Sequence, residues 1–202
     1  MNCEKYKPTY ILIAINAAAY VYTSMVGGNW LNTNFNAIPP LYQFNFEVLH
    51  GSYYQLLTSM FIHASIPHIV GNMLFLFIFG LRAEEMFSLP EYLGIYLVGG
   101  LVGNVLSLAF GPNFLSVGAS GAIFALFGAC VVYDRHSVRQ SILGALVYAF
   151  FLLFLSGLGT GINDLAHLGG LGFGLVVGYL IASTRKPQQE VSIRYKHPLY
   201  PF

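Results

Sequence analysis

The feature that most constrains this chain is a series of long apolar stretches separated by charged or glycine-rich breaks. The six stretches cover residues 9–26, 65–81, 92–110, 118–133, 138–155 and 163–181. A helix needs about 20 apolar residues to cross a hydrocarbon core of roughly 30 Å. Only 8% of the 202 residues are charged, far below the roughly 25% of a soluble domain. The sequence therefore predicts an all-α membrane protein, a bundle of six transmembrane helices.

The distribution of the nine basic residues supports this count. All of them fall in the amino tail, in the loops after the second and fourth stretches, or in the carboxyl tail. Basic residues stay on the cytoplasmic side of a membrane. We therefore expect a multi-pass protein of the cell membrane with both termini in the cytoplasm. Residues 1–202 would form a single domain, with a polar cytoplasmic tail at residues 184–202.

The amino end allows one alternative. Lys5, Lys7, the apolar run 10–15 and the alanines at 17–19 resemble a signal peptide with a small-residue cleavage site. A mostly apolar stretch continues to Val26, which favours a span. The net charge of +1 gives no indication of nucleic-acid binding, because topology explains the basic residues.

A few polar residues lie inside the predicted spans, where ionisable groups are functional candidates. His68 and Asn72 are four residues apart at the start of the second span, so they share a helix face. Ser120 opens the fourth span, and His167 lies in the sixth. Counted from the cytoplasmic charges, these groups lie at heights of about 15–27 Å. They are therefore expected to form one polar layer below the outer surface.

Small residues would allow the helices that carry this layer to approach closely, which is how helices associate in lipid. On the fourth span these residues are Gly121, Ala125 and Gly128. On the face of His167 they are Gly170, Gly174 and Gly178. Packing of the two rows would bring Ser120 and His167 within reach of each other.

Each of these residues also has a purely structural interpretation. A serine in a span often bonds a backbone carbonyl, and a lone buried histidine more often packs than reacts. The coincidence of a hydroxyl, an imidazole and an amide at one depth favours chemistry instead. A seryl nucleophile needs a base. An acyl-transfer intermediate needs oxyanion donors, for which His68, Asn72 and backbone N–H groups near Ser120 are candidates.

Three segments carry these residues and occur in order along the chain. They are residues 63–72 (HASIPHIVGN), 118–121 (GASG) and 166–174 (AHLGGLGFG). Together they resemble the rhomboid family of intramembrane serine proteases, and the likeness extends over residues 9–183. The resemblance implies a rhomboid-type bundle of six transmembrane helices.

The resemblance also implies a role for each residue. Ser120 would be the nucleophile and His167 the general base, with His68, Asn72 and the Ser120 amide forming the oxyanion site. The residues expected to pack near this site are Gly118, Gly121, Phe124, Gly170 and Gly174. The fifth span would admit the transmembrane segment of a substrate protein from the lipid bilayer. No metal or other cofactor is implied.

Two positions depart from the family pattern. Tyr54-Gln55 stands where the family often has Trp-Arg, and Phe124 stands where it often has tyrosine. Asp164 is a candidate for the third member of a Ser-His-Asp triad, because it lies three residues before His167. It follows a glycine-rich loop, however, where aspartate commonly caps a helix. We therefore expect a dyad.

Other functions fit less well. The His-Glu-x-x-His motif of membrane metalloproteases is absent. The G-x-S-x-G elbow of soluble hydrolases is not met, because position 122 is alanine. Asp134 and Asp164 would lie at opposite ends of the bundle, which excludes an aspartyl dyad. The alternatives left open are a catalytically silent relative that binds or escorts membrane proteins, and a small transporter.

Overall fold

The computed structural model describes residues 7–138 and 163–185. The long helices are α1 (Pro8–Gly27), α4 (Ile66–Met86), α5 (Leu89–Leu106), α6 (Ser120–Val138) and α8 (Asp164–Thr184). Short elements between them are β1 (Gln43–Phe44), α2 (Asn45–Leu49), α3 (Gln55–Thr58), η1 (Ser59–Phe61), η2 (Ser107–Phe110) and β2 (Leu115–Ser116).

The expectation of a helical, multi-pass membrane protein is confirmed. Four segments of the described chain are long and apolar enough to cross a membrane: Pro8–Gly27, Ile66–Met86, Leu89–Phe110 and Asp164–Thr184. The apolar part of α6 is shorter, Ser120–Tyr133. The predicted span 138–155 lies almost entirely outside the described residues, so the count of six stays a prediction.

The second predicted span ended at residue 81, where the first charge follows, but α4 continues to Met86. Its last turn is charged, and Arg82 pairs there with Glu85 over 2.5 Å. A helix need not end where the apolar core ends, because charged side chains in its last turn reach water or the headgroups. The sequence pattern therefore located the apolar part of this helix but not its end.

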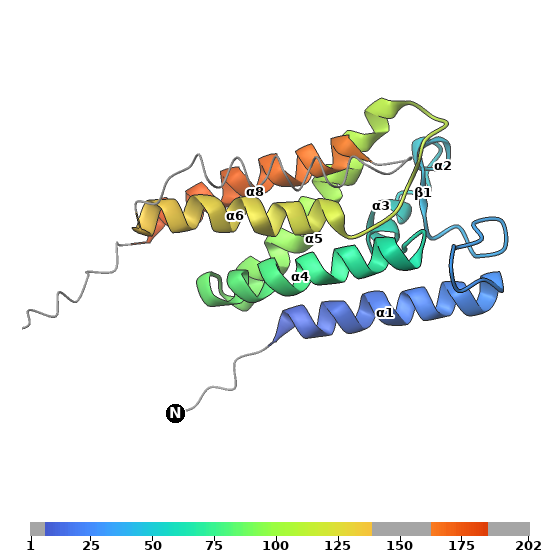
Figure 1. Ribbon diagram of the computed structural model, residues 1–202. Coiled ribbons are helices and arrows are strands. Elements are labelled where there is room, and N and C mark those ends of the chain that lie inside the picture. The colour runs from blue at the N-terminus through green and yellow to red at the C-terminus, as the bar shows by residue number, and fades with distance from the viewer. Residues whose placement is uncertain (1–6, 139–162, 186–202) are drawn as a thin grey trace, which may run out of the picture.

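The helices pack as a bundle around α6. Figure 1 shows α6 and α8 side by side, with α4 between α6 and α1. In agreement with this view, α6 packs against α4, α5 and α8, while α1 packs chiefly against α4. The short elements β1, α2 and α3 gather at one end of the long helices (Figure 1). At this end β1 pairs with β2 in antiparallel register, Gln43 opposite Ser116.

Buried amides fasten this end of the molecule. Gln43, which is fully buried, donates from Nε2 to the carbonyl oxygen of Asn104 and the hydroxyl of Ser107. Asn104 in turn donates from Nδ2 to the Leu56 carbonyl and the Ser59 hydroxyl. Buried polar groups are costly unless they are bonded. This network therefore ties the segment between α1 and α4 to the end of α5.

The closest helix contact joins α6 and α8 through their backbones. A side chain added at Gly170 or Gly174 would collide with the carbonyl of Gly121 or Ala125. One at Gly178 would lie 2.6 Å from the carbonyl oxygen of Ala129. Both rows repeat every four residues, so one helix face meets another along its length.

At the far end of the contact, Gly178 lies against Ala129 rather than Gly128. Gly128 faces α8 at the backbone of Leu171, whose carbonyl oxygen would lie 2.8 Å from an added Cβ. The four-residue repeat of α8 continues on α6 through Ala129. The three small residues predicted on α6 thus all face α8, and Ala129 extends the row by one more contact.

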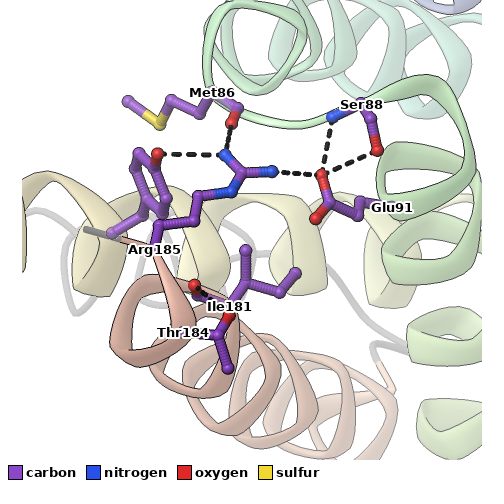
Figure 2. Close-up of polar contacts among 7 residues, drawn as sticks. Met86, Ser88, Glu91, Ile181, Thr184 and Arg185 are labelled. Carbon is purple, nitrogen blue, oxygen red and sulfur yellow. Dashed lines mark hydrogen bonds and ion pairs between the residues drawn. The ribbon is translucent and has the colours of Figure 1, made fainter. Parts of the chain in front are cut away.

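At the opposite end of the bundle from β1, Arg185 joins three parts of the chain. Figure 2 shows its guanidinium between the carbonyl of Met86 and the carboxylate of Glu91, which also accepts from Ser88. The same guanidinium donates to the hydroxyl of Tyr133 on α6. A planar fork of donors suits such multiple acceptors. Arg185 therefore holds the last turn of α8 against α6 and the turn between α4 and α5.

The glycine contacts lead to a stability prediction. Gly174→Ala should lower the melting temperature in detergent, because overpacking a tight contact costs about 1–3 kcal/mol. Gly172→Ala is the matched control on the same helix, since an added Cβ there meets nothing within 4 Å. Alanine favours helix over glycine by about 1 kcal/mol, so Gly172→Ala should be neutral or stabilising. Equal melting temperatures for the two variants would contradict the contact.

The Arg185 contacts lead to a second stability prediction. Arg185→Ala should lower the melting temperature, because it removes donors from a carbonyl, a carboxylate and a hydroxyl at once. Glu85→Ala is the control, since it breaks an ion pair whose side chains are 49% and 58% exposed. Exposed pairs contribute only about 0–1 kcal/mol. Thermal unfolding of both variants should show the larger loss for Arg185→Ala, and the reverse order would refute this role.

Candidate active site

Ser120 and His167 lie together at the end of the bundle that carries β1 and β2. Ser120 is the first residue of α6, and His167 lies in the first turn of α8. The Oγ atom of Ser120 and the Nε2 atom of His167 are 2.7 Å apart. His167 is buried, with 4% of its surface exposed. An imidazole nitrogen at this distance can take up the proton of a serine hydroxyl.

No carboxylate supports His167 in the part of the chain that the structure describes. The Nδ1 atom of its ring is buried and has no hydrogen-bond partner among the described residues. Asp164 is exposed, although it is only one turn away. The expected capping role falls on its neighbour, because the helix begins at Asp164 and Asn163 is the N-cap. The Oδ1 atom of Asn163 accepts from the Ala166 N–H over 2.9 Å.

Gly118 shapes the approach to Ser120. Its φ of +118° is a conformation that side chains rarely adopt. Its N–H donates to the carbonyl oxygen of Ser59 over 2.9 Å. A Cβ at this position would lie 2.8 Å from Nε2 of His68 and 4.0 Å from Oγ of Ser120. Because Gly118 has no side chain, the His68 ring and the Ser120 hydroxyl can both lie close to its Cα atom.

His68 faces this position with a defined nitrogen. Its Nδ1 atom accepts from the N–H of Ala64 over 3.4 Å. In a neutral imidazole one nitrogen accepts and the other donates. The proton is thus assigned to Nε2, the atom nearest Gly118. His68 can therefore donate a hydrogen bond toward the Ser120 side of the site.

Asn72 lies one turn further along α4 and is buried. Its Nδ2 atom donates to the carbonyl oxygen of His68 over 2.9 Å. A side-chain amide nitrogen has two hydrogens, so one N–H is left for another acceptor. The Oδ1 atom has no partner among the residues that the structure describes.

His63 is a neighbour of this group to which the sequence analysis gave no role. It is fully buried, and its ring meets that of His68 edge to face at 5.2 Å. Burial lowers the pKa of His63 to about 3, with a further contribution from His68. The ring is therefore neutral around pH 7 and adds no charge beside His68. In the sequence it opens the segment 63–72 and precedes His68 by five residues.

Phe124 and Gln55, which depart from the family pattern, both make defined contacts. The Phe124 ring lies 4.7 Å from the His167 ring, at an angle of 35°. Gln55 is buried, and its Oε1 atom accepts from the N–H of Phe44 over 2.9 Å. Gln55 thus anchors β1 rather than the site itself. Among the described residues no cluster of three or more metal-ligating side chains occurs.

Comparison with known proteins places this chain in a family. The family model described as "Rhomboid domain" matches residues 50–184. "RHOMBOID-like protein 6, mitochondrial" of Arabidopsis thaliana is 36% identical over 133 residues, which are 63% of this chain and 43% of that protein.

Two relatives come from Bacillus subtilis. "Putative rhomboid protease YdcA" is 30% identical over 151 residues, 71% of this chain and 74% of that protein. "Rhomboid protease GluP" is 31% identical over 168 residues, 81% of this chain and 32% of that protein. The chain thus spans less than half of the Arabidopsis protein and of GluP. The family match over most of the chain shows that this protein belongs to the rhomboid family.

Proposed function

We propose that this protein is an intramembrane serine endopeptidase that cleaves transmembrane segments of membrane proteins with a Ser120–His167 dyad. The observation that carries the proposal is the 2.7 Å contact between Ser120 Oγ and His167 Nε2 at the start of two packed helices. Its relatives YdcA and GluP are named as rhomboid proteases. Family membership supports the same class of activity here.

The reaction would follow from this pair. The Oγ atom of Ser120 attacks the carbonyl carbon of the scissile peptide while His167 Nε2 accepts the hydroxyl proton. The protonated imidazole then gives this proton to the leaving amine, which breaks the peptide bond and leaves an acyl-enzyme. Water, deprotonated by the same imidazole, hydrolyses the ester and restores both side chains. The Phe124 ring lies 4.7 Å from the imidazole, and a nearby aromatic ring would favour its protonated form.

Donors for the oxyanion would come from α4 and from the start of α6. The first N–H groups of a helix have no acceptor within the helix, so the N–H of Ser120 at the start of α6 is free of the helical ladder. The positive end of the α6 dipole adds to it. His68 would donate from Nε2 and Asn72 from its second amide hydrogen.

The substrate and the orientation follow from the membrane setting. The helices are long and apolar enough to cross a membrane, so a substrate segment would arrive from the lipid and partners would be transmembrane proteins. Lys7, Arg82 and Arg185 belong to one end of the bundle, because Thr9 N–H donates to Glu84 and Arg185 donates to Met86. Basic residues favour the cytoplasm. We place this end, and both termini, on the cytoplasmic side of the cell membrane.

The dyad is tested with a fluorophosphonate and a model single-span substrate. The parent protein should be labelled at Ser120 and should cleave. Ser120→Ala and His167→Ala should fold, resist labelling and abolish cleavage, since loss of either group of such a pair costs roughly 10⁶ in rate in a soluble serine protease. Asp164→Ala is the matched control from the same turn as His167 and should keep cleavage within about tenfold, against about 10⁴ lost without a triad aspartate. Cleavage at the parent rate by either dyad variant would refute the proposal.

The oxyanion assignment is tested by removing its side-chain donors. Loss of one such donor costs about 10²–10³ in rate in a soluble protease. We expect similar losses of turnover for His68→Ala and Asn72→Ala, with a smaller effect on labelling by a small reactive probe. His50→Ala, which removes an exposed histidine directly after α2, is the control. Parent-like turnover in both variants would leave His68 and Asn72 as packing residues only.

A further inference from the structure

A second hydrogen bond runs beside the one between Ser120 and His167. The Nδ2 atom of Asn163 donates to the Oγ atom of Ser116 over 2.6 Å, and both side chains are buried. Ser116 lies four residues before Ser120, and Asn163 lies four residues before His167. The two bonds therefore join the same two segments of chain, each across 47 residues.

Asn163 uses both ends of its amide. Its Oδ1 atom caps α8 by accepting from the N–H of Ala166, and its Nδ2 atom reaches Ser116. The cap requires an oxygen and fixes which end of the amide faces the helix. The first turn of α8, which carries His167, is thus attached to β2 through one side chain.

Ser116 is itself held in place by backbone contacts. It pairs with Gln43 in the sheet of β1 and β2, and Gly118 two residues later donates to the Ser59 carbonyl. Gln43 itself is bonded to the end of α5 through Asn104. The bridge between Asn163 and Ser116 therefore ties α8 to the part of the molecule that sets the position of Ser120.

Such a tie matters because no hydrogen bond among the described residues orients the far side of the His167 ring. Its Nδ1 atom has no partner in the described part of the chain. The ring position thus depends on the backbone of the first turn of α8, on the contact with Ser120 and on the packing around the ring, which includes Phe124. A displacement of about 1 Å between reacting groups can cost 10²-fold in rate.

We infer that the hydrogen bond between Asn163 and Ser116 positions His167 against Ser120, which makes Asn163 and Ser116 positioning residues for peptide-bond cleavage. This role rests on the proposed dyad. It goes beyond capping, because a cap needs only the Oδ1 atom of Asn163, whereas the bridge needs Nδ2 and the hydroxyl of Ser116.

The two roles are separable with two variants. Ser116→Ala keeps the cap and removes the bridge. Asn163→Ser also keeps a good capping residue but is too short to reach Ser116. Both should lower kcat on a model single-span substrate by roughly tenfold or more, with KM changed by less than about twofold. Labelling of Ser120 by a fluorophosphonate should slow in parallel.

Three controls complete the experiment. Ser116→Thr retains the hydroxyl and should restore kcat. Ser88→Ala removes a helix cap of α5 remote from the site, so it should lower the melting temperature and leave kcat unchanged. The double variant Ser116→Ala/Asn163→Ser should be no slower than the poorer single variant, because both remove one interaction.

Two results would overturn the inference while the dyad stands: parent-like kcat in Ser116→Ala and Asn163→Ser, or losses that multiply in the double variant. Failure of the parent protein itself to label at Ser120 would instead refute the proposed function. Labelling of the parent together with slowed, non-additive variants supports both.

Discussion

The architecture depends on the direct backbone contact between α6 and α8. Gly170 and Gly174 lie against the carbonyls of Gly121 and Ala125, with no side chain between them. In lipid, helices gain little from burying apolar surface against each other, and close van der Waals contact takes its place. This contact also sets the site, because Ser120 directly precedes the first contact on α6 and His167 lies three residues before the first contact on α8.

The polar end of the bundle is the second constraint. Here the chain leaves helical structure between α1 and α4, where backbone and amide groups must find partners. Gln43 and Asn104 supply them across 61 residues, and Gln55 does so for β1. These hydrogen bonds fix the segment between α1 and α4 in place. It can therefore hold Gly118 in a left-handed conformation beside His68, at the position where the chain enters α6.

Much of this could be predicted from the sequence, because spans, small-residue rows and intramembrane polar groups are local patterns. Ser120 and His167 came from depth counting and from three short motifs. The long-range partners could not be predicted in this way. Nothing local in Arg185 indicates Glu91, which lies 94 residues away. The helix cap was expected at Asp164 but is Asn163, because a shift of one residue in the start of α8 decides which side chain meets the free N–H groups.

The absence of a carboxylate partner for His167 among the described residues changes what determines its position. In a triad, an aspartate orients the imidazole and favours one tautomer. Here the ring stands on the first turn of α8, whose backbone touches that of α6 at Gly121. Orientation by a single side chain is thus replaced by orientation through two helix starts, their packing and the Asn163 amide. Because close-packed contacts have few alternative arrangements, this packing would position the proposed dyad. A change in the packing of α6 against α8 should therefore alter the distance between Ser120 and His167.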